Sequence, residues 1–304
     1  MSNADSIKAK LKKIAIEEDK PFDYLLMHYL IERLLYRLSI SKYSNNFILK
    51  GGLLLYTIFE NDARATKDID FLARQINNIP EELSGAFSEI ASIQVDDSVR
   101  FDPDTITVER IKEDADYQGV RIKLTGYLDK SRHILQFDIG FGDVIVPKPV
   151  DMEYPSLLDM EKPRLKAYSL ESVIAEKFQA MIYLAESNSR MKDFYDIYKL
   201  SHSFDFEGRT LYEAVSQTIE RRATPLTRTP TVFSDAFPNL KDKQTQWRAF
   251  QRRIGVANGL EFALVIANIK SFLLPLYNSI LSENEFFGHW NHANAEWTEN
   301  SVNY

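Results

Sequence analysis

Two aspartates stand close together in an otherwise apolar run, KDIDFL. Asp68 and Asp70 are two residues apart, and side chains of a β-strand alternate between its faces, so a strand here would display both carboxylates on one face. Two such carboxylates repel one another unless a cation neutralises them, and oxygen ligands on a rigid element suit Mg²⁺. The pair is a candidate cation site, although two exposed aspartates at the end of a strand would give the same pattern.

A third carboxylate stands inside a second β-like run, HILQFDIGF. Alternation places Asp138 on one face of this predicted strand and Leu135, Phe137 and Ile139 on an opposite, core-facing side. Three carboxylates on two strands of one sheet are what a two-metal phosphoryl-transfer site requires, with one metal activating the attacking oxygen and the other holding a triphosphate. Asp143, just past this run, is interpreted as part of a turn.

A glycine pair precedes the aspartates by one predicted helix. Gly51 and Gly52 lie between a predicted strand, NFILK, and a predicted helix, GLLLYTIFE. At such a junction the absence of side chains permits close approach, and the free backbone N–H groups and the helix dipole favour a phosphate. A glycine pair alone also suits an ordinary turn; its place one helix before the aspartates makes the phosphate-loop interpretation more specific.

The second half of the chain supplies positive charge on predicted helices. In LESVIAEKFQAMIYL the apolar stripe includes Ile174 and Met181, and Lys177 stands between them. Its ammonium either snorkels out of an apolar surface or points at the phosphates of a nucleotide. In the next segment, NSRMKDFYDIYKL, the spacing from Arg190 to Asp193 is three residues and is typical of a pair on a helix surface. A second pair of this kind, between Lys192 and Asp196, is predicted by their four-residue spacing.

The bulk composition indicates a globular protein. The 304 residues are 44% hydrophobic and include no cysteine, which excludes disulfide frameworks and zinc–thiolate sites and is consistent with a cytoplasmic protein. No signal peptide is predicted, and no membrane span is predicted because the most apolar late stretch is interrupted by Glu261, Asn268 and Lys270. The net charge of −7 argues against nucleic-acid binding by the whole surface, so a local basic stretch from Arg221 to Arg253 is the best candidate.

The order of the predicted elements indicates an α+β fold with a mixed sheet. Two helices are expected before residue 42, followed by strand, helix, strand, a further helix and three β-like runs. Residues 147–169 are rich in proline and are predicted to be irregular, and the chain after them is predicted to be helical, apart from the polar tail HWNHANAEWTENSVNY, for which no element is predicted. The predicted domains are residues 1–160, a sheet domain with N-terminal helices, and residues 161–304, a helical domain.

The motifs, taken in order, resemble a known family. FILKGGLLLY, ARATKDIDF, FDIGFGD, YSLESVIAEKFQAM and NSRMKDFYDIYKL are similar to blocks of the AbiEii/AbiGii-type nucleotidyltransferase toxins of the DNA polymerase β-like superfamily. The resemblance spans about half of the chain, from Phe47 to Leu200. It implies a polymerase β-like nucleotidyltransferase core whose nucleotide site is completed by the helical domain.

The resemblance also implies roles for individual residues. The expected catalytic residues are Asp68, Asp70, Asp138, Lys177 and Asp193. The residues expected to bind the nucleotide are Gly51, Gly52, Arg64, Thr66, Lys177 and Arg190. The expected metal ligands are Asp68, Asp70 and Asp138, with Mg²⁺, in one or two ions, as cofactor and a nucleoside triphosphate (NTP) as substrate. The superfamily's usual Gly-Ser is Gly-Gly here, so backbone donors must replace the missing hydroxyl.

The resemblance implies a toxin of a toxin–antitoxin or phage-defence system that transfers a nucleotide to the 3′ end of tRNA, with an antitoxin encoded nearby. Asp138 is the group expected to accept the proton of the attacking hydroxyl, for which it must lie within about 3 Å. Nucleotidylation of a protein hydroxyl, a catalytically idle nucleotide-binding module, a metal nuclease and a sugar-nucleotide transferase are the alternatives. His289 and His292 have a spacing that could hold a metal, but two histidines in a polar tail more often have no such role.

Overall fold

The chain divides into two compact units. The computed structural model describes residues 3–60, 63–114, 117–256 and 259–299. Unit 1 comprises Met1–Asp143 and Pro149–Tyr168, and unit 2 comprises Val144–Lys148 and Ser169–Tyr304. Each unit is described by itself below.

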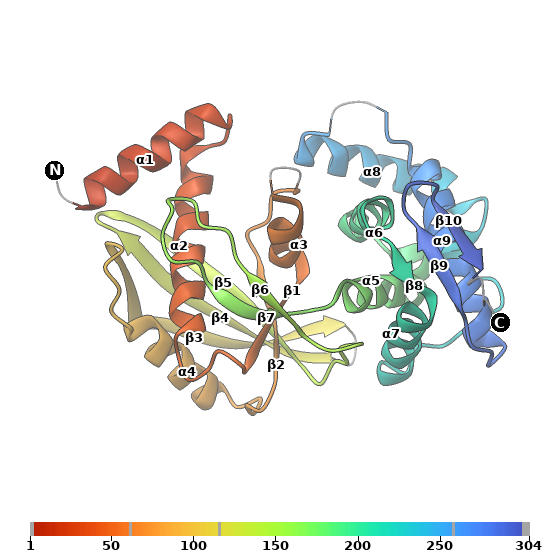
Figure 1. The fold of residues 1–304 in the computed structure, drawn as a ribbon, viewed down its shortest axis with the longest axis horizontal. Helices are drawn as coiled ribbons and strands as arrows, with labels where there is room; N and C mark the ends of the chain where they lie inside the picture. The colour runs from red at the N-terminus through yellow and green to blue at the C-terminus, as the bar shows by residue number, and fades with distance from the viewer. Residues whose placement is uncertain (1–2, 61–62, 115–116, 257–258, 300–304) are drawn as a thin grey trace. The chain divides into compact units, whose positions relative to one another are not determined.

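Unit 1 combines helices with a mixed sheet (Figure 1), as the sequence predicts. Its helices are α1 (Asn3–Glu17), α2 (Phe22–Ser39), α3 (Gly51–Phe59) and α4 (Pro80–Ser92). Its strands are β1 (Phe47–Lys50), β2 (Ile69–Ala73), β3 (Val99–Asp114), β4 (Tyr117–Leu128), β5 (Ser131–Phe141), β6 (Val150–Glu153) and β7 (Arg164–Ala167). Within the described residues they form one seven-stranded sheet in the order β3-β4-β5-β2-β1-β7-β6.

Parallel and antiparallel pairs alternate irregularly across this sheet. β2 pairs with β5 and β1 with β7 in parallel, whereas the other neighbours are antiparallel. The prediction of an irregular segment at residues 147–169 is wrong, because this segment contains β6 and β7. These short strands are held by backbone pairing at one edge of the sheet, which a proline-rich composition does not reveal.

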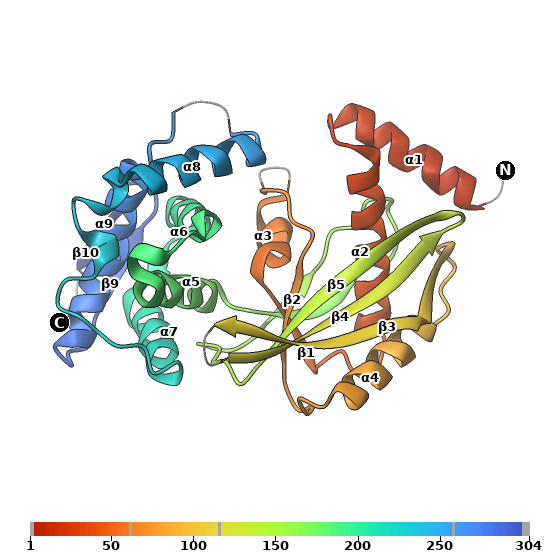
Figure 2. The same cartoon turned by 180° about the vertical axis from the view of Figure 1, so that it is seen from behind.

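One face of the sheet is apolar and is covered by helices. Leu49, Phe71, Ile139 and Val120 lie in register across β1, β2, β5 and β4, and all four are fully buried. Phe87 of α4 packs against this face, and α2 lies across it, in front of the strands in Figure 1 and behind them in Figure 2. Because side chains alternate along each strand, the polar residues are left on the opposite face.

Unit 2 is built mainly from helices. They are α5 (Leu170–Leu184), α6 (Met191–Ser203), α7 (Gly208–Arg221), α8 (Lys241–Ile254) and α9 (Phe262–Leu281), with 3₁₀ turns at Ala185–Ser187, Thr231–Phe233 and Phe237–Asn239. By length and composition alone, α9 would be able to cross a membrane. It also packs as a core helix does, since Val265, Ile269 and Leu273 are fully buried.

Unit 2 also contains three short strands that the sequence analysis does not predict. β8 (Phe206–Glu207), β9 (Gly288–Asn291) and β10 (Glu296–Glu299) form a three-stranded sheet, while residues 300–304 of the predicted polar tail lie outside the described residues. Aromatic packing explains this hairpin, because Trp290 stacks against Phe272 of α9 at 4.6 Å and is fully buried. The ring of His292 contacts Asp205 at 2.8 Å.

Helix α2 holds the segment that leads into β2. The Nε2 of His28 donates a hydrogen bond to the backbone carbonyl of Thr66 (3.1 Å), and the His28 ring packs between Tyr24 and Tyr56. Burial lowers the pKa of His28 to about 4, and the hydrogen bond to Thr66, which acts in the opposite direction, does not offset it. The imidazole is therefore neutral at pH 7 and anchors the backbone two residues before Asp68.

This burial makes the stability of the protein depend on pH. An unfolded histidine binds a proton near pH 6.5 and the folded His28 only near pH 4, so lowering the pH through this window favours the unfolded chain. We expect His28 to cost about 2 kcal/mol of unfolding free energy between pH 7 and pH 5. Urea denaturation at both pH values, compared with His28→Gln, measures it. An equal pH dependence in the two proteins would contradict this prediction.

Candidate active site

A row of five charged side chains crosses the polar face of the unit 1 sheet. Lys50 of β1 lies in register with Asp70 of β2, Asp70 with Asp138 of β5, Asp138 with Arg121 of β4, and Arg121 with Glu109 of β3. Residues in register on neighbouring strands point to the same face about 4.8 Å apart. The row therefore sets Asp70 directly beside Asp138 and places one cation on each side of this pair.

Gly51 lies against Asp70 of the row, and Gly52 lies against Thr66 and Arg64. Gly51 follows β1 directly and has a left-handed φ of +68°, and a Cβ built on it would lie 2.0 Å from Oδ2 of Asp70. A Cβ on Gly52 would lie 2.7 Å from Oγ1 of Thr66 and 3.2 Å from a guanidinium nitrogen of Arg64. The absence of side chains at both positions thus lets the start of α3 approach the carboxylate and the guanidinium closely.

Asp68 lies just before β2 rather than inside it, because the strand begins at Ile69. The predicted strand, KDIDFLAR, starts at Lys67 and so two residues too early, which is the ordinary uncertainty of an element's end. The Asp68 side chain is exposed, and its charge acts on Arg121. Asp68 and Asp138 therefore lie within electrostatic reach of the same guanidinium.

The predicted strand around Asp138 is confirmed. Leu135, Phe137 and Ile139 are buried on the core face, and Asp138 is on the polar face of β5. Arg121 binds Asp138 through two parallel hydrogen bonds, from Nε to Oδ1 and from Nη2 to Oδ2, both 2.8 Å long. These bonds, ahead of the electrostatic contribution of Asp68, raise the pKa of Arg121 above its usual value.

Sequence reasoning missed three residues of this row, Lys50, Arg121 and Glu109. The Nζ of Lys50 lies 3.1 Å from Oδ2 of Asp143, and both side chains are buried. Asp143 is therefore the buried partner of Lys50, which its interpretation as part of a turn did not reveal. The alternation in QGVRIKLTGYL does place Arg121 opposite its apolar neighbours, but the residue that it faces depends on the register between strands, which one strand cannot show.

In unit 2, the predicted lysine is bound by carboxylates. The Nζ of Lys177 on α5 lies 2.7 Å from Asp193 and 2.8 Å from Asp196, both on α6. Arg190 binds the other oxygen of Asp193 at 2.6 Å. Burial raises the pKa of Asp193, but the charges of Lys177 and Arg190 more than offset it, so the pKa lies below its usual value. Two cations and two buried carboxylates form a charge-balanced network.

Lys177 is buried, which confirms its predicted place in the apolar stripe. Its ammonium contacts two carboxylates, which neither the snorkelling interpretation nor the phosphate interpretation describes. The contact between Arg190 and Asp193 is also confirmed, although Asp193 is fully buried rather than on the helix surface. The pair predicted from Lys192 to Asp196 is wrong, because Asp196 faces Lys177 on the neighbouring helix. Spacing along one helix cannot show a partner on another.

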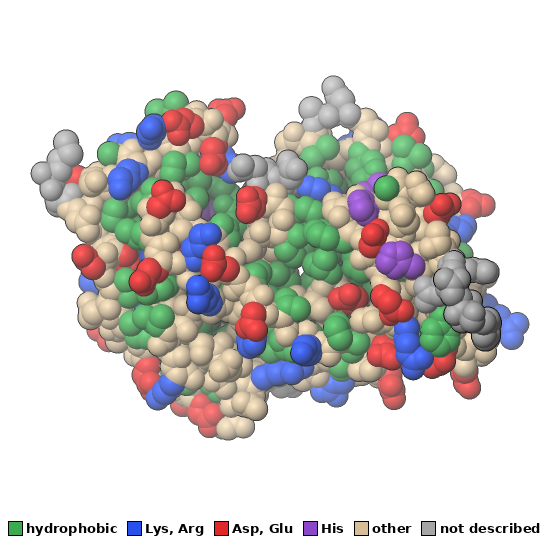
Figure 3. Space-filling model, in the orientation of Figure 1, with side chains coloured by type: hydrophobic (Ala, Val, Ile, Leu, Met, Phe, Trp, Pro, Cys, Tyr) green, Lys and Arg blue, Asp and Glu red, His purple; other side chains and the backbone are tan. Residues whose placement is uncertain are grey.

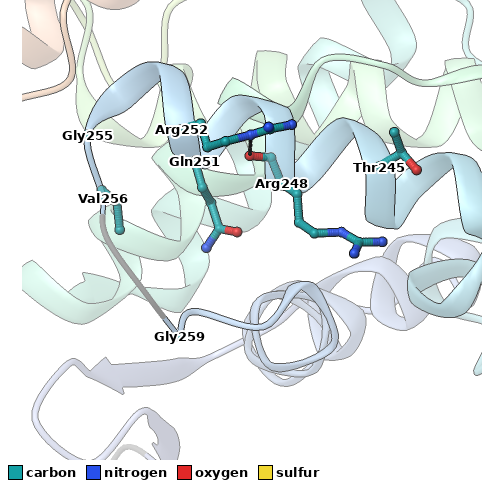
Figure 4. Close-up of a pocket in the computed structure, with 7 residues that line it drawn as sticks. All are labelled: Thr245, Arg248, Gln251, Arg252, Gly255, Val256 and Gly259. Atoms are coloured by element: carbon teal, nitrogen blue, oxygen red, sulfur yellow. Dashed lines mark hydrogen bonds between the residues drawn. The ribbon is translucent and has the colours of Figure 1, made fainter.

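The predicted basic stretch is partly buried. Lys243 is 1% exposed and donates to the carbonyl of Asn188, while Arg222 lies against Glu176. Two exposed arginines of α8, Arg248 and Arg252, line a pocket of about 880 Å³, which is shown in Figure 4. On the face shown in Figure 3, acidic and basic side chains are otherwise interspersed.

Two carboxylates, Asp70 of the row and Asp68 just before β2, offer donor atoms that suit a divalent cation. Asp68 and Asp70 offer oxygen ligands of the kind that Mg²⁺ prefers. Asp138, the third predicted ligand, has both oxygens on Arg121. Among the described residues no group of three or more His, Asp or Glu side chains is gathered so that it could hold a metal.

A mixed sheet, a Gly-Gly turn at a helix start and carboxylates beside it are the features that the family resemblance predicts for a nucleotidyltransferase, and a fold by itself does not establish an activity. A model of the family described as "Nucleotidyl transferase AbiEii toxin, Type IV TA system" matches residues 33–268. The chain belongs to this family, and is a nucleotidyltransferase toxin of a type IV toxin–antitoxin system. Such an enzyme uses an NTP and has an antitoxin as partner.

The solved structure of a nucleotidyltransferase toxin shows the same fold. The nucleotidyltransferase toxin MenT4 of Mycobacterium tuberculosis is 15% identical, with a TM-score of 0.52, and the match covers 91% of this chain and 99% of that one. A putative nucleotidyltransferase from H. pylori is 13% identical, with a TM-score of 0.49, over 86% of this chain and 98% of that one. A search of curated proteins finds no match.

The contact of Gly51 with Asp70 predicts that a single methyl group disturbs the site. We expect Gly51→Ala to lower the free energy of unfolding by about 1 kcal/mol or more, because a left-handed residue gains a Cβ that overlaps the Asp70 carboxylate. Gly85→Ala is the matched control: it lies in α4 with open space around it, so stability should rise by up to about 1 kcal/mol. Chemical denaturation measures both, and equal effects would contradict the prediction.

The charge network of unit 2 predicts a large effect of Lys177. Replacing Lys177 by Met leaves Asp193 and Asp196 buried with one cation fewer, and we expect a loss of about 3 kcal/mol or more in unfolding free energy. The control Lys192→Met removes a lysine of the next helix, where we expect a change under about 0.5 kcal/mol. Denaturant midpoints report both, and a small loss for Lys177→Met would show that the network contributes little to stability.

Proposed function

We propose that this toxin transfers a nucleotide from an NTP to the 3′ end of tRNA in a reaction that depends on Mg²⁺. The observation that carries the proposal is the pair of carboxylates Asp70 and Asp138, in register on neighbouring strands, with the Gly51–Gly52 turn against Asp70. Carboxylates beside the backbone N–H groups of a helix start suit a triphosphate that binds together with a divalent cation.

Asp68 and Asp70 are the proposed ligands of the cation. When bound, Mg²⁺ neutralises charge on the triphosphate as its α-phosphate is attacked. The backbone N–H groups at the start of α3 donate hydrogen bonds to phosphate oxygens. The guanidinium of Arg64, which lies against Gly52, adds a positive charge there. The bond from the acceptor oxygen to the α-phosphorus forms as the bond to pyrophosphate breaks, and pyrophosphate leaves.

The surface of α8 supports a nucleic acid as acceptor. Two of its exposed arginines, Arg248 and Arg252, line an open pocket and place guanidinium groups where phosphates of a backbone can reach them (Figure 4). The net charge of −7 makes such a local concentration of positive charge necessary. A protein acceptor would have no comparable need for it.

Contributions of Lys177, Asp193 and Arg190 to the same nucleotide stay predictions, as do the role of Asp138 as general base and a place in phage defence. We also propose that the toxin acts in the cytoplasm, where NTP and tRNA are available. These parts of the proposal rest on the family resemblance and on the cysteine-free sequence.

Transfer of label tests the proposal directly. Purified protein is incubated with total tRNA, Mg²⁺ and each α-labelled NTP in turn, beside Asp68→Asn, Asp70→Asn and the control Asp104→Asn, which changes an exposed aspartate of β3. We expect label on tRNA with one or more of the NTPs, a loss of about 100-fold or more in each site variant, and no loss in the control.

Other outcomes would change the assignment. Label on protein would keep the site and replace the acceptor. Shortened RNA would indicate a nuclease. NTP binding without transfer would indicate an idle nucleotide-binding module, and equal transfer by the Asp70 variant would move the site away from the charged row.

A further inference from the structure

Lys50, the last residue of β1, contacts both residues at which the chain leaves unit 1. The chain passes into unit 2 after Asp143 and again after Tyr168. The Nζ of Lys50 lies 3.1 Å from Oδ2 of Asp143 and 5.5 Å from the centre of the Tyr168 ring. One ammonium therefore links the end of β1 to both exit residues of unit 1.

These contacts are buried. The Lys50 side chain is 9% exposed and the Asp143 side chain 3% exposed, and the Tyr168 residue is 1% exposed. Salt screens a buried ion pair only weakly, and an ammonium over an aromatic ring adds an attraction of its own. Loss of one partner of a buried ion pair is costly. The ammonium is therefore well placed to hold both exit residues against β1.

Backbone hydrogen bonds join the same segments within each unit. In unit 1, the N–H of Tyr168 donates to the carbonyl of Leu49 (2.9 Å), and Leu49 also lies in register with Ala167 of β7. In unit 2, the N–H of Val146 donates to Oγ of Ser172 in the first turn of α5 (2.9 Å). The two segments that leave unit 1 are thus fixed on the unit 1 side and joined to each other on the unit 2 side.

The glycine turn follows Lys50 directly and tolerates little displacement. Gly51 has a left-handed φ of +68°, and a Cβ on it would lie 2.0 Å from Oδ2 of Asp70. Because the backbone lies this close to the carboxylate, a small shift at the end of β1 would move the N–H groups that the proposed triphosphate uses. The place of Lys50 therefore matters to the nucleotide site although its ammonium is buried.

We infer that Lys50 is a positioning residue. Held by Asp143 and Tyr168, it fixes the Gly51–Gly52 turn to the two residues at which the chain leaves unit 1, and it does not itself bind the triphosphate. This inference rests on the proposed binding of an NTP at the turn. The alternative is that Lys50 binds phosphate directly, as the lysine of a glycine-rich phosphate loop does.

Amide hydrogen exchange tests the holding role without nucleotide and without transfer activity. The proteins compared are the unmodified chain, Lys50→Met, and the double variant Lys50→Met with Asp143→Asn, which removes both charges of the buried pair and so guards against simple misfolding. Lys166→Met is the matched control. Lys166 lies two residues before Tyr168 and binds Asp151 at 2.6 Å, but Asp151 is exposed.

We expect exchange to be about tenfold faster or more at the Tyr168 amide and in the glycine turn of both Lys50 variants. In the Lys166→Met control, and in α4 of every protein, exchange should stay within about twofold of the unmodified chain. A double variant that exchanges like the unmodified chain overturns the inference. Faster exchange throughout α4 also overturns it, because Lys50 would then stabilise the whole unit rather than position the turn.

Binding of non-hydrolysable NTP analogues in the presence of Mg²⁺, measured by isothermal titration calorimetry, separates positioning from direct contact. If Lys50 acts through Asp143, then Lys50→Met, Asp143→Asn and the double variant each raise the Kd by about tenfold, because changes to two partners of one interaction do not add. If Lys50 binds phosphate itself, Asp143→Asn keeps the lysine and leaves the affinity unchanged or higher. That result overturns the inference.

Failure of the inference differs from failure of the proposed function. If the unmodified chain binds an NTP analogue and all three variants bind it equally well, the inference alone is overturned. If the unmodified chain binds none of the analogues, the proposed nucleotide site is overturned, and the role of Lys50 toward the triphosphate fails with it.

Discussion

The repulsion between two carboxylates on neighbouring strands is the constraint on which the rest of the site depends. Asp70 and Asp138 face each other across β2 and β5, and a sheet can hold like charges there only if cations compensate them. Arg121 compensates Asp138 from one side, and Lys50 lies in register with Asp70 on the other. Lys50 is in turn bound to the buried Asp143, so its charge is itself partly balanced. The row therefore retains negative charge beside the glycine turn. The proposed cation, with its triphosphate, would bind to this charge.

Unit 2 also compensates carboxylates that lie close together, but it does so between helices rather than across a sheet. Inside its helical core, the charges of two cations, Lys177 and Arg190, balance those of two carboxylates. The carboxylates are Asp193 and Asp196, so the network is neutral as a whole although its sequence motif is rich in charged residues. Buried networks of this kind contribute less to net stability than their short contacts suggest, but removing one member is costly. The motif therefore has a role in stability as well as a predicted role in binding the nucleotide. A loss of activity on substitution of Lys177 alone cannot separate these two roles.

Sequence patterns predicted most of unit 1 because its elements are locally encoded. The alternation in HILQFDIGF places Asp138 correctly, and the glycine pair marks the junction of β1 and α3. Interactions between strands were not predictable: Arg121 faces Asp138 and Lys50 faces Asp70 only through register, which depends on the whole sheet. The same holds for β6, β7 and the β9–β10 hairpin, whose polar or proline-rich sequences become strands through backbone pairing and aromatic packing.

The central claim is the proposal that the polar face of the sheet binds a cation through Asp68 and Asp70. Crystals grown with Mn²⁺ and a non-hydrolysable NTP analogue test it most directly, because anomalous scattering locates manganese without assumptions about the reaction. The account predicts a manganese peak at Asp68 and Asp70, with phosphates at the Gly51–Gly52 turn. A manganese ion bound elsewhere in the chain would contradict it.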